Sequence, residues 1–152
     1  MKVAVFSGRF DPPHIGHIMS IHKLSTSNDI VIIPILDYCD RFISSESACE
    51  VFNSVFEHYQ SHSLIIFLIN FIHFAKITAK EYDDLLKQCG IDQGINDVTY
   101  YAGNKEVLDN FNAMGINCVY LDRSMDEVYT GTKIREAVNG KQDNPKNIQH
   151  YQ

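Results

Sequence analysis

The chain has 152 residues, of which 45% are hydrophobic and 21% are charged, and its formal net charge is −6. This composition fits one globular domain with a sizeable core. The negative balance argues against a nucleic-acid-coating surface, but a small anionic ligand needs only a few local donors.

The sequence shows no sign of export or membrane insertion. Met1 runs straight into a short strand-like segment, with no secretory apolar region, and the four cysteines form no Cys-x-x-Cys pair. The longest apolar run, at 64–74, is interrupted by Asn70 and His73 and is shorter than the ~20 residues that a membrane helix needs. We therefore expect a cytoplasmic protein with reduced thiols and without nucleic-acid or membrane partners.

In the first part of the chain, the pattern predicts a strand at 2–7, a helix at 15–25 and a second strand at 30–36. The second strand is apolar on both sides, as a buried parallel strand is. Pro34 lies within it and has no N–H to donate, so we expect this strand to end near Pro34. The apolar face expected for the first helix carries Ile15, Ile18, Ile21 and Leu24.

The alternation of helices and strands continues to the end of the chain. A capping-box pattern at Thr78 and Glu81 begins one helix, and Gly90 ends it. Gly115 ends another helix in the same way. The remaining expected helices are at 46–59, 106–114 and 132–138, and the remaining strands at 64–72, 98–102 and 116–121.

Five strands alternating with helices predict an α/β fold, a Rossmann-like five-stranded parallel sheet with helices on both faces. Ligands of such sheets bind outside the carboxyl ends of the strands, where the strand order reverses. We expect the first strand and its following loop at that point. No linker divides the chain, so residues 1–140 are expected to form a single domain, followed by a polar tail at 141–152.

The loop after the first strand carries the chemistry-bearing motif Gly8-Arg-Phe-Asp-Pro-Pro-His-Ile-Gly-His17. It enters a helix N-terminus, where backbone N–H groups and the helix dipole favour an anion. His14 and His17 lie three residues apart, on one side of the first helical turn, and can donate hydrogen bonds to a ligand there. Gly16 has no Cβ, so a bulky ligand can lie against the backbone between them.

This motif resembles the signature of the nucleotidyltransferase superfamily, which includes cytidylyltransferases and the nicotinamide-mononucleotide and pantetheine-phosphate adenylyltransferases. With Arg9 it is most similar to the archaeal-type nicotinamide-mononucleotide adenylyltransferases. Class I aminoacyl-tRNA synthetases also carry His-Ile-Gly-His at this place, but they are far longer, and no lysine-rich second signature is found here. The residues that carry the resemblance are Gly8, Phe10, Asp11, Pro12, His14, Gly16 and His17.

A second constellation, Thr130-Gly131-Thr132-Lys133-Ile134-Arg135, gathers hydroxyls, a glycine and cations at another expected helix start. This combination suits phosphate oxygens, although a threonine cap with cations on a solvated face would look the same. It resembles the second superfamily signature. Two looser matches follow the fourth and second strands. Asn104 would contact the base or the second substrate, and Asp40 and Arg41 stand where the family places acceptor-binding residues.

The resemblance implies that a phosphate oxygen of one substrate attacks the α-phosphorus of a nucleoside triphosphate and releases pyrophosphate. Such a step needs alignment and charge neutralisation. His14 and His17 would donate to the α- and β-phosphates, and Asp11 would brace the turn. Mg²⁺ would bridge the leaving phosphates with few protein ligands. The other implied catalytic and nucleotide-binding residues are Gly8, Arg9, Phe10, Gly16, Asn104, Thr130, Gly131, Thr132 and Arg135.

Several interpretations remain beside adenylyl transfer from ATP to an acceptor such as nicotinamide mononucleotide. The same motifs serve a CTP-dependent cytidylyltransferase acting on a phospho-alcohol, and a non-catalytic nucleotide-binding module on this fold is a third possibility. A metal site at His14, His17 and His22 lacks an acidic or thiol partner at ligand spacing. The chain has more apolar residues than one core needs, which is compatible with a homo-oligomer. Phe71, Phe74 and Tyr100 are candidates for these additional residues.

Overall fold

Strand β1 (Lys2–Val5) lies at the centre of a parallel sheet in which the strand order is β3-β2-β1-β4-β5. The other strands are β2 (Ile30–Asp37), β3 (Ser63–Asn70), β4 (Asp97–Ala102) and β5 (Cys118–Tyr120). Because β2 and β4 flank β1, the strand order reverses at β1, and the expected five-stranded parallel sheet is confirmed. This computed structural model describes residues 1–37, 40–57, 63–70 and 73–121.

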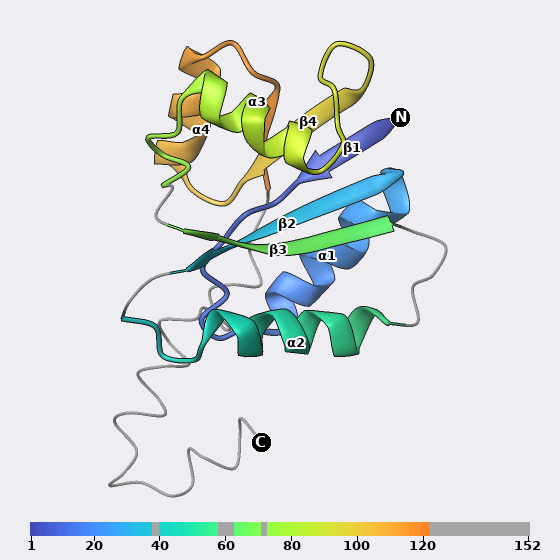
Figure 1. Ribbon diagram of the computed structural model, residues 1–152, viewed down its shortest axis with the longest axis vertical. Helices are drawn as coiled ribbons and strands as arrows, with labels where there is room; N and C mark the ends of the chain where they lie inside the picture. The colour runs from blue at the N-terminus through green and yellow to red at the C-terminus, as the bar shows by residue number, and fades with distance from the viewer. Residues whose placement is uncertain (38–39, 58–62, 71–72, 122–152) are drawn as a thin grey trace, which may run out of the picture.

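Helices cover both faces of the sheet, as expected (Figure 1). Helices α1 (Ile15–Ser27) and α2 (Ser45–Phe56) pack on one face, and α3 (Ala79–Gln88) and α4 (Lys105–Ala113) on the other. None of these helices in the described ranges is both long and apolar enough to cross a membrane. The helix expected at 132–138 and the tail at 141–152 lie outside the described residues, so the division at residue 140 stays a prediction.

The side chains of β1 alternate between two buried clusters. Val3 and Val5 pack with the residues of α3 and α4, whereas Ala4 and the following Phe6 pack with those of α1 and α2. All four are at most 2% exposed, because a central strand is covered on both faces. β1 is thereby held rigidly, and the loop that follows it starts from a fixed point.

The prediction that β2 ends near Pro34 is wrong, because β2 continues to Asp37. The carbonyl of Pro34 accepts from the N–H of Gly8, at 3.3 Å. In a parallel sheet the N–H and the C=O of one residue point toward the same neighbouring strand. The missing N–H of Pro34 therefore faces the β1 side, where β1 has already ended at Val5, and no ladder hydrogen bond between named strands is lost.

Two expectations about apolar residues are corrected by the structure. Ile15 is 46% exposed, and the buried side of α1 passes instead through His17, Ile21 and Leu24. Phe74 and Tyr100 are 3% and 2% exposed, and both belong to the core beneath α3 and α4. These two aromatic residues therefore carry no argument for a homo-oligomer, and Phe71 lies outside the described residues.

Helix α3 begins at the capping box predicted from the sequence, and α3 and α4 end at the predicted glycines. The Thr78 hydroxyl accepts from the N–H of Glu81, and the Glu81 carboxylate accepts from the N–H of Thr78, both at 3.1 Å. This confirms the expected capping box. Gly90 and Gly115 follow α3 and α4 with φ of 76° and 73°, a left-handed conformation that glycine adopts without steric cost.

Candidate active site

The chain leaving β1 runs beside β2 before it turns toward α1. The carbonyl of Gly8 accepts from the N–H of Leu36 at 2.9 Å, and Gly8 forms an isolated parallel bridge with Ile35. The Gly8–His17 motif thus begins at the carboxyl edge of the sheet, where β1 marks the reversal of strand order. This is the placement that the sequence predicted for the first strand and its loop.

The side chain of Phe10 is buried beneath this turn. It is 2% exposed, and its ring meets the edges of the Phe52 and His17 rings with centroids 4.8 Å away in each case. Its φ of 48° is left-handed, which costs a residue with a Cβ about 1–2 kcal/mol. Packing of the ring offsets this strain. The sequence assigned Phe10 to the nucleotide; its side chain belongs to the α1–α2 core, and a direct nucleotide contact stays a prediction.

A side chain at Gly8 would crowd the ring of Phe10. A Cβ added to Gly8 would lie 3.0 Å from the tip of the Phe10 ring and 3.2 Å from a neighbouring ring carbon. That ring is fixed on its other sides by Phe6, Phe52 and His17. Gly8 therefore serves the packing of the turn, and its assignment to the nucleotide stays a prediction.

His14 and His17 together form the N-terminal cap of α1. The Nδ1 of His14 accepts from the N–H of Gly16 at 3.1 Å, and the Nδ1 of His17 accepts from the N–H of His14 at 3.2 Å. This is the geometry of a capping box in which imidazoles replace the usual hydroxyl and carboxylate. Because a nitrogen that accepts carries no hydrogen, the ring proton of each neutral imidazole is on Nε2.

The cap has a direct chemical consequence. Both imidazoles are buried, with residue exposures of 6% and 7%, and they are stacked with centroids 3.6 Å apart. With Nδ1 used for the backbone, the donor that remains on each neutral ring is Nε2–H, and the Nε2 of His14 is itself buried. The sequence predicted two donors on one turn of a helix, and the structure adds the reason why both rings hold the same tautomer.

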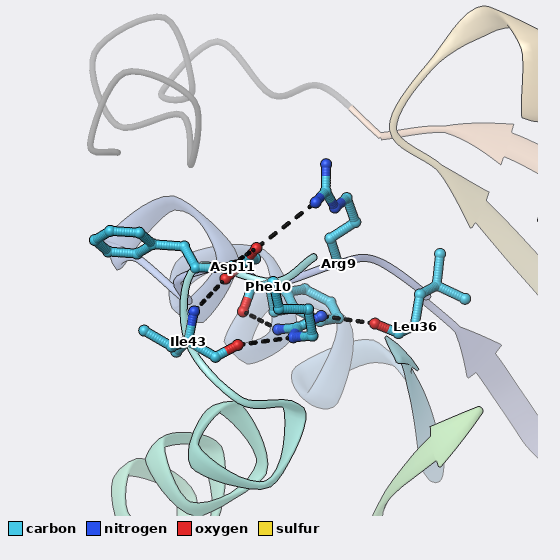
Figure 2. Close-up of polar contacts among 7 residues, drawn as sticks. Arg9, Phe10, Asp11, Leu36 and Ile43 are labelled. Carbon is cyan, nitrogen blue, oxygen red and sulfur yellow. Dashed lines mark hydrogen bonds and ion pairs between the residues drawn. The ribbon is translucent and has the colours of Figure 1, made fainter. Parts of the chain in front are cut away.

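Asp11 fastens the turn to the segment before α2. Its Oδ1 accepts from the N–H of Ile43 at 2.8 Å, and its Oδ2 accepts from the N–H of Phe42 at 2.9 Å. Figure 2 shows this carboxylate between the backbone of Ile43 and the guanidinium of Arg9, whose Nη2 is 3.7 Å from Oδ2. Asp11 is 2% exposed and braces the turn in the manner that we expected.

Arg41 is engaged with the backbone on three sides. Its guanidinium nitrogens donate to the carbonyls of Leu36, Ile43 and Phe10, and Figure 2 shows these contacts. The acceptor-binding role that the sequence suggested for Arg41 and for the exposed Asp40 stays a prediction. No pattern in the sequence predicted these contacts with Leu36 and Phe10, because they depend on where β2 and the β1–α1 turn meet.

Asn104 lies at the carboxyl end of β4, next to β1 in the sheet. It is the N-cap of α4, and its Oδ1 accepts from the N–H of Val107 at 3.0 Å. The loops after β1, β2 and β4 therefore reach the same edge of the sheet, and they bring the motif, Arg41 and Asn104 to that edge. The predicted site residues Thr130, Gly131, Thr132 and Arg135 lie outside the described residues.

A contact that sequence reasoning missed ties the motif to β4. The hydroxyls of Ser7 and Tyr100 form a hydrogen bond across 93 positions of the chain. Burial raises the pKa of the Tyr100 phenol, so it stays protonated throughout the physiological range. Its ring also stacks on Phe111, with centroids 4.1 Å apart. Ser7 is thereby held from the side of the sheet opposite to α1.

The donor set of the site is cationic and imidazole-rich. Within the described ranges, no group of three or more His, Cys, Asp or Glu side chains could hold a metal ion. The Asp11 carboxylate already accepts two backbone N–H groups. Mg²⁺ prefers carboxylates together with substrate phosphates, so the described residues do not fit a protein-held Mg²⁺ at this turn.

Several solved structures are similar to this chain in fold, and some of them are described as adenylyltransferases. Neither a protein-family model nor a curated protein matches the sequence. A bifunctional NMN adenylyltransferase/ADP ribose pyrophosphatase from Francisella tularensis is 19% identical, with a TM-score of 0.70 over 91% of this chain and 42% of that one. Another structure of the Francisella protein is complexed with AMP and a manganese ion.

Two further solved structures are similar to this chain in fold. A NadR protein in complex with NAD and AMP-PNP is 20% identical, with a TM-score of 0.62 over 93% of this chain and 44% of that one. A putative nicotinate-nucleotide adenylyltransferase from Vibrio parahaemolyticus is 17% identical, with a TM-score of 0.58 over 91% and 88% of the two chains. The chain therefore spans less than half of the Francisella and NadR chains, and it shares the Rossmann-like fold of all three.

Proposed function

We propose that this protein transfers a nucleoside monophosphate from ATP to a phosphate-bearing acceptor such as nicotinamide mononucleotide, with release of pyrophosphate. The observation that carries the proposal is the His14–His17 cap. Two stacked imidazoles of the same tautomer stand at a helix N-terminus, on the strand where the sheet order reverses. That arrangement suits an anionic ligand, and neighbours of this fold are complexed with NAD, AMP-PNP and AMP.

In this mechanism the acceptor phosphate is the nucleophile and needs no general base. His14 and His17 donate from Nε2 to the α- and β-phosphates, where negative charge develops as the bond to the leaving pyrophosphate breaks. The rate comes from alignment of the two substrates and from these donors, which are already ordered by the backbone. Arg9, at 44% side-chain exposure beside Asp11, would bind the β,γ end.

The second signature completes the proposed site. Thr130, Gly131, Thr132 and Arg135 would hold the β,γ-phosphates with hydroxyls, backbone N–H groups and a guanidinium. Gly16 would let the ligand approach the backbone of α1. Asn104 would approach the base or the second substrate, using its Nδ2 because Oδ1 caps α4. Mg²⁺ would arrive with the triphosphate and neutralise part of its charge.

A pyrophosphate-release assay tests the proposal. Purified protein is incubated with Mg²⁺, each of ATP, CTP, GTP and UTP, and nicotinamide mononucleotide, nicotinate mononucleotide or a phospho-alcohol. Release that requires ATP and a mononucleotide supports the proposal. Release with CTP and a phospho-alcohol replaces it with cytidylyl transfer. A thermal shift with a nucleotide but no release with any acceptor identifies a binding module and refutes the enzyme.

A further inference from the structure

The guanidinium of Arg41 joins parts of the chain that are far apart in sequence. Its Nη1 donates to the carbonyl of Leu36 in β2 at 2.6 Å, and its Nε to the carbonyl of Ile43 before α2 at 2.9 Å. Its Nη2 reaches the carbonyl of Phe10, 31 positions away, at 3.1 Å. The planar fork of an arginine spreads its donors over three separate nitrogens, whereas the three N–H donors of a lysine share a single nitrogen and cannot reach carbonyls that lie as far apart.

Asp11 provides a second connection between the β1–α1 turn and Ile43. Arg41 holds the carbonyl of Ile43, while the Asp11 carboxylate accepts from the N–H of the same residue. The residues Phe10 and Asp11 are thereby connected to Ile43 on both sides of its backbone. Such a closed loop of hydrogen bonds fixes the orientation of the Phe10 peptide more firmly than either bond would alone.

Phe10 in turn contacts a proposed catalytic imidazole. Its left-handed backbone, with φ of 48°, directs the ring onto His17 at 4.8 Å and 84°. A relaxed backbone at Phe10 would carry the ring away from His17. The Nδ1 of His17 would then no longer be held on the N–H of His14, which is the bond that selects the tautomer.

We propose that Arg41 is a positioning residue for the His14–His17 pair. It holds the Phe10 carbonyl, and through the Phe10 ring it keeps His17 in the orientation in which Nδ1 accepts from the backbone and Nε2 carries the proton. The proposal rests on the proposed function only for the use of these imidazoles in nucleotidyl transfer. It assigns Arg41 a role through Phe10 in place of a contact with the acceptor.

The first test does not depend on activity. Long-range ¹H–¹⁵N correlation spectra of wild type and Arg41→Lys report which ring nitrogens of His14 and His17 carry hydrogen. We expect unprotonated Nδ1 and protonated Nε2 in wild type, and a mixture of tautomers for His17 in the variant. The matched control is Lys87→Met, which removes an exposed cation from the far face of the sheet. An unchanged tautomer in a folded Arg41→Lys protein overturns the proposal.

The second test separates positioning from acceptor contact. In the reaction identified by the pyrophosphate assay, we expect Arg41→Lys to lower kcat by roughly 10–100-fold, because small misplacement of a catalytic group is costly. KM for both substrates should stay within about twofold of wild type, since the lost interaction orients a donor. A rise in KM for the acceptor at unchanged kcat overturns the proposal in favour of direct acceptor binding.

A double-mutant cycle checks the route through Phe10. Phe10→Leu alone and in combination with Arg41→Lys should show strongly non-additive losses in kcat, because both act on His17. Additive losses overturn the proposal. If Arg41→Lys does not fold, Arg41→Gln, which retains an amide donor, takes its place in each arm. If wild type shows no transfer with any substrate pair, the proposed function fails, and the NMR arm still decides the role of Arg41.

Discussion

The imidazoles of His14 and His17 are stacked, with centroids 3.6 Å apart and ring planes inclined by 23°. Each ring accepts a backbone N–H at Nδ1, so the residues that cap α1 are also the residues proposed to donate to a triphosphate. Structural and chemical roles are therefore assigned to different nitrogens of the same rings. This division makes the two roles separable by substitution.

His17→Ala removes one donor and one capping bond. We expect kcat to fall by roughly 10²–10³-fold, the scale of losing one preorganised donor. Loss of the cap should cost about 1 kcal/mol, so the protein stays folded. Steady-state kinetics and urea unfolding measure the two effects, and His22→Ala, an exposed histidine on the same helix, is the control. Full turnover of folded His17→Ala would remove His17 from the mechanism.

His14→Asn separates capping from donation. Asparagine is among the best N-cap residues, so the free energy of unfolding should stay within about 0.5 kcal/mol of wild type or rise. The Nε2–H donor is lost, and kcat should fall by roughly 10²-fold. Paired kinetic and unfolding measurements check this outcome. A loss of stability without a loss of turnover would show that His14 serves the fold alone.

Gly8→Ala places a Cβ 3.0 Å from the Phe10 ring, which is packed on its other sides. We expect a loss of about 1–3 kcal/mol in the free energy of unfolding. Gly94→Ala is the matched control, because its Cβ would lie 3.1 Å from the carboxylate of Asp92, an exposed side chain held by one hydrogen bond from the N–H of Gly94 and not by packed rings. Equal losses for the two variants in urea unfolding would argue against a fixed Phe10 ring.

Asp11→Asn replaces an oxygen that accepts a backbone N–H with an NH₂ group that cannot accept. Because Asp11 is 2% exposed, the unmatched N–H should cost about 1–3 kcal/mol. Asp29→Asn is the control, since Asp29 accepts from the N–H of Lys2 at an exposed position and should cost about 0.5 kcal/mol or less. Thermal and urea unfolding of both variants would reveal whether Asp11 braces the turn.

Arg135→Ala tests the part of the proposed site outside the described residues. We expect weaker binding of the triphosphate by isothermal titration calorimetry, by about 1.5–3 kcal/mol, because a charged hydrogen bond to phosphate is lost. Circular dichroism confirms that the variant is folded. Unchanged affinity would refute the convergence of the Gly8–His17 motif with the Thr130–Arg135 segment on one triphosphate.

The sequence predicted those features that are encoded locally. Alternating strand and helix periodicity gave the parallel sheet, the Thr78–Glu81 pattern gave the start of α3, and the position of Gly8–His17 after the first strand placed the motif at the strand-order reversal. The predictions from the sequence were wrong for Pro34, where β2 was expected to end, and for Ile15, which was expected on the buried face of α1. The outcome at those positions depends on which neighbour the backbone or the helix face meets.

By itself, the sequence determined the fold class and the turn that carries the two histidines, because periodicity, caps and turn residues act over a few neighbouring positions. Only the tertiary structure decided the left-handed Phe10, the Asp11 and Arg41 links, and the shared tautomer of the imidazoles. The Asp11 and Arg41 links need groups 31 positions apart to meet, and no local pattern specifies which carbonyl a distant guanidinium will reach. The shared tautomer depends on cap contacts within three positions, but the residue types alone do not specify which ring nitrogen meets the backbone.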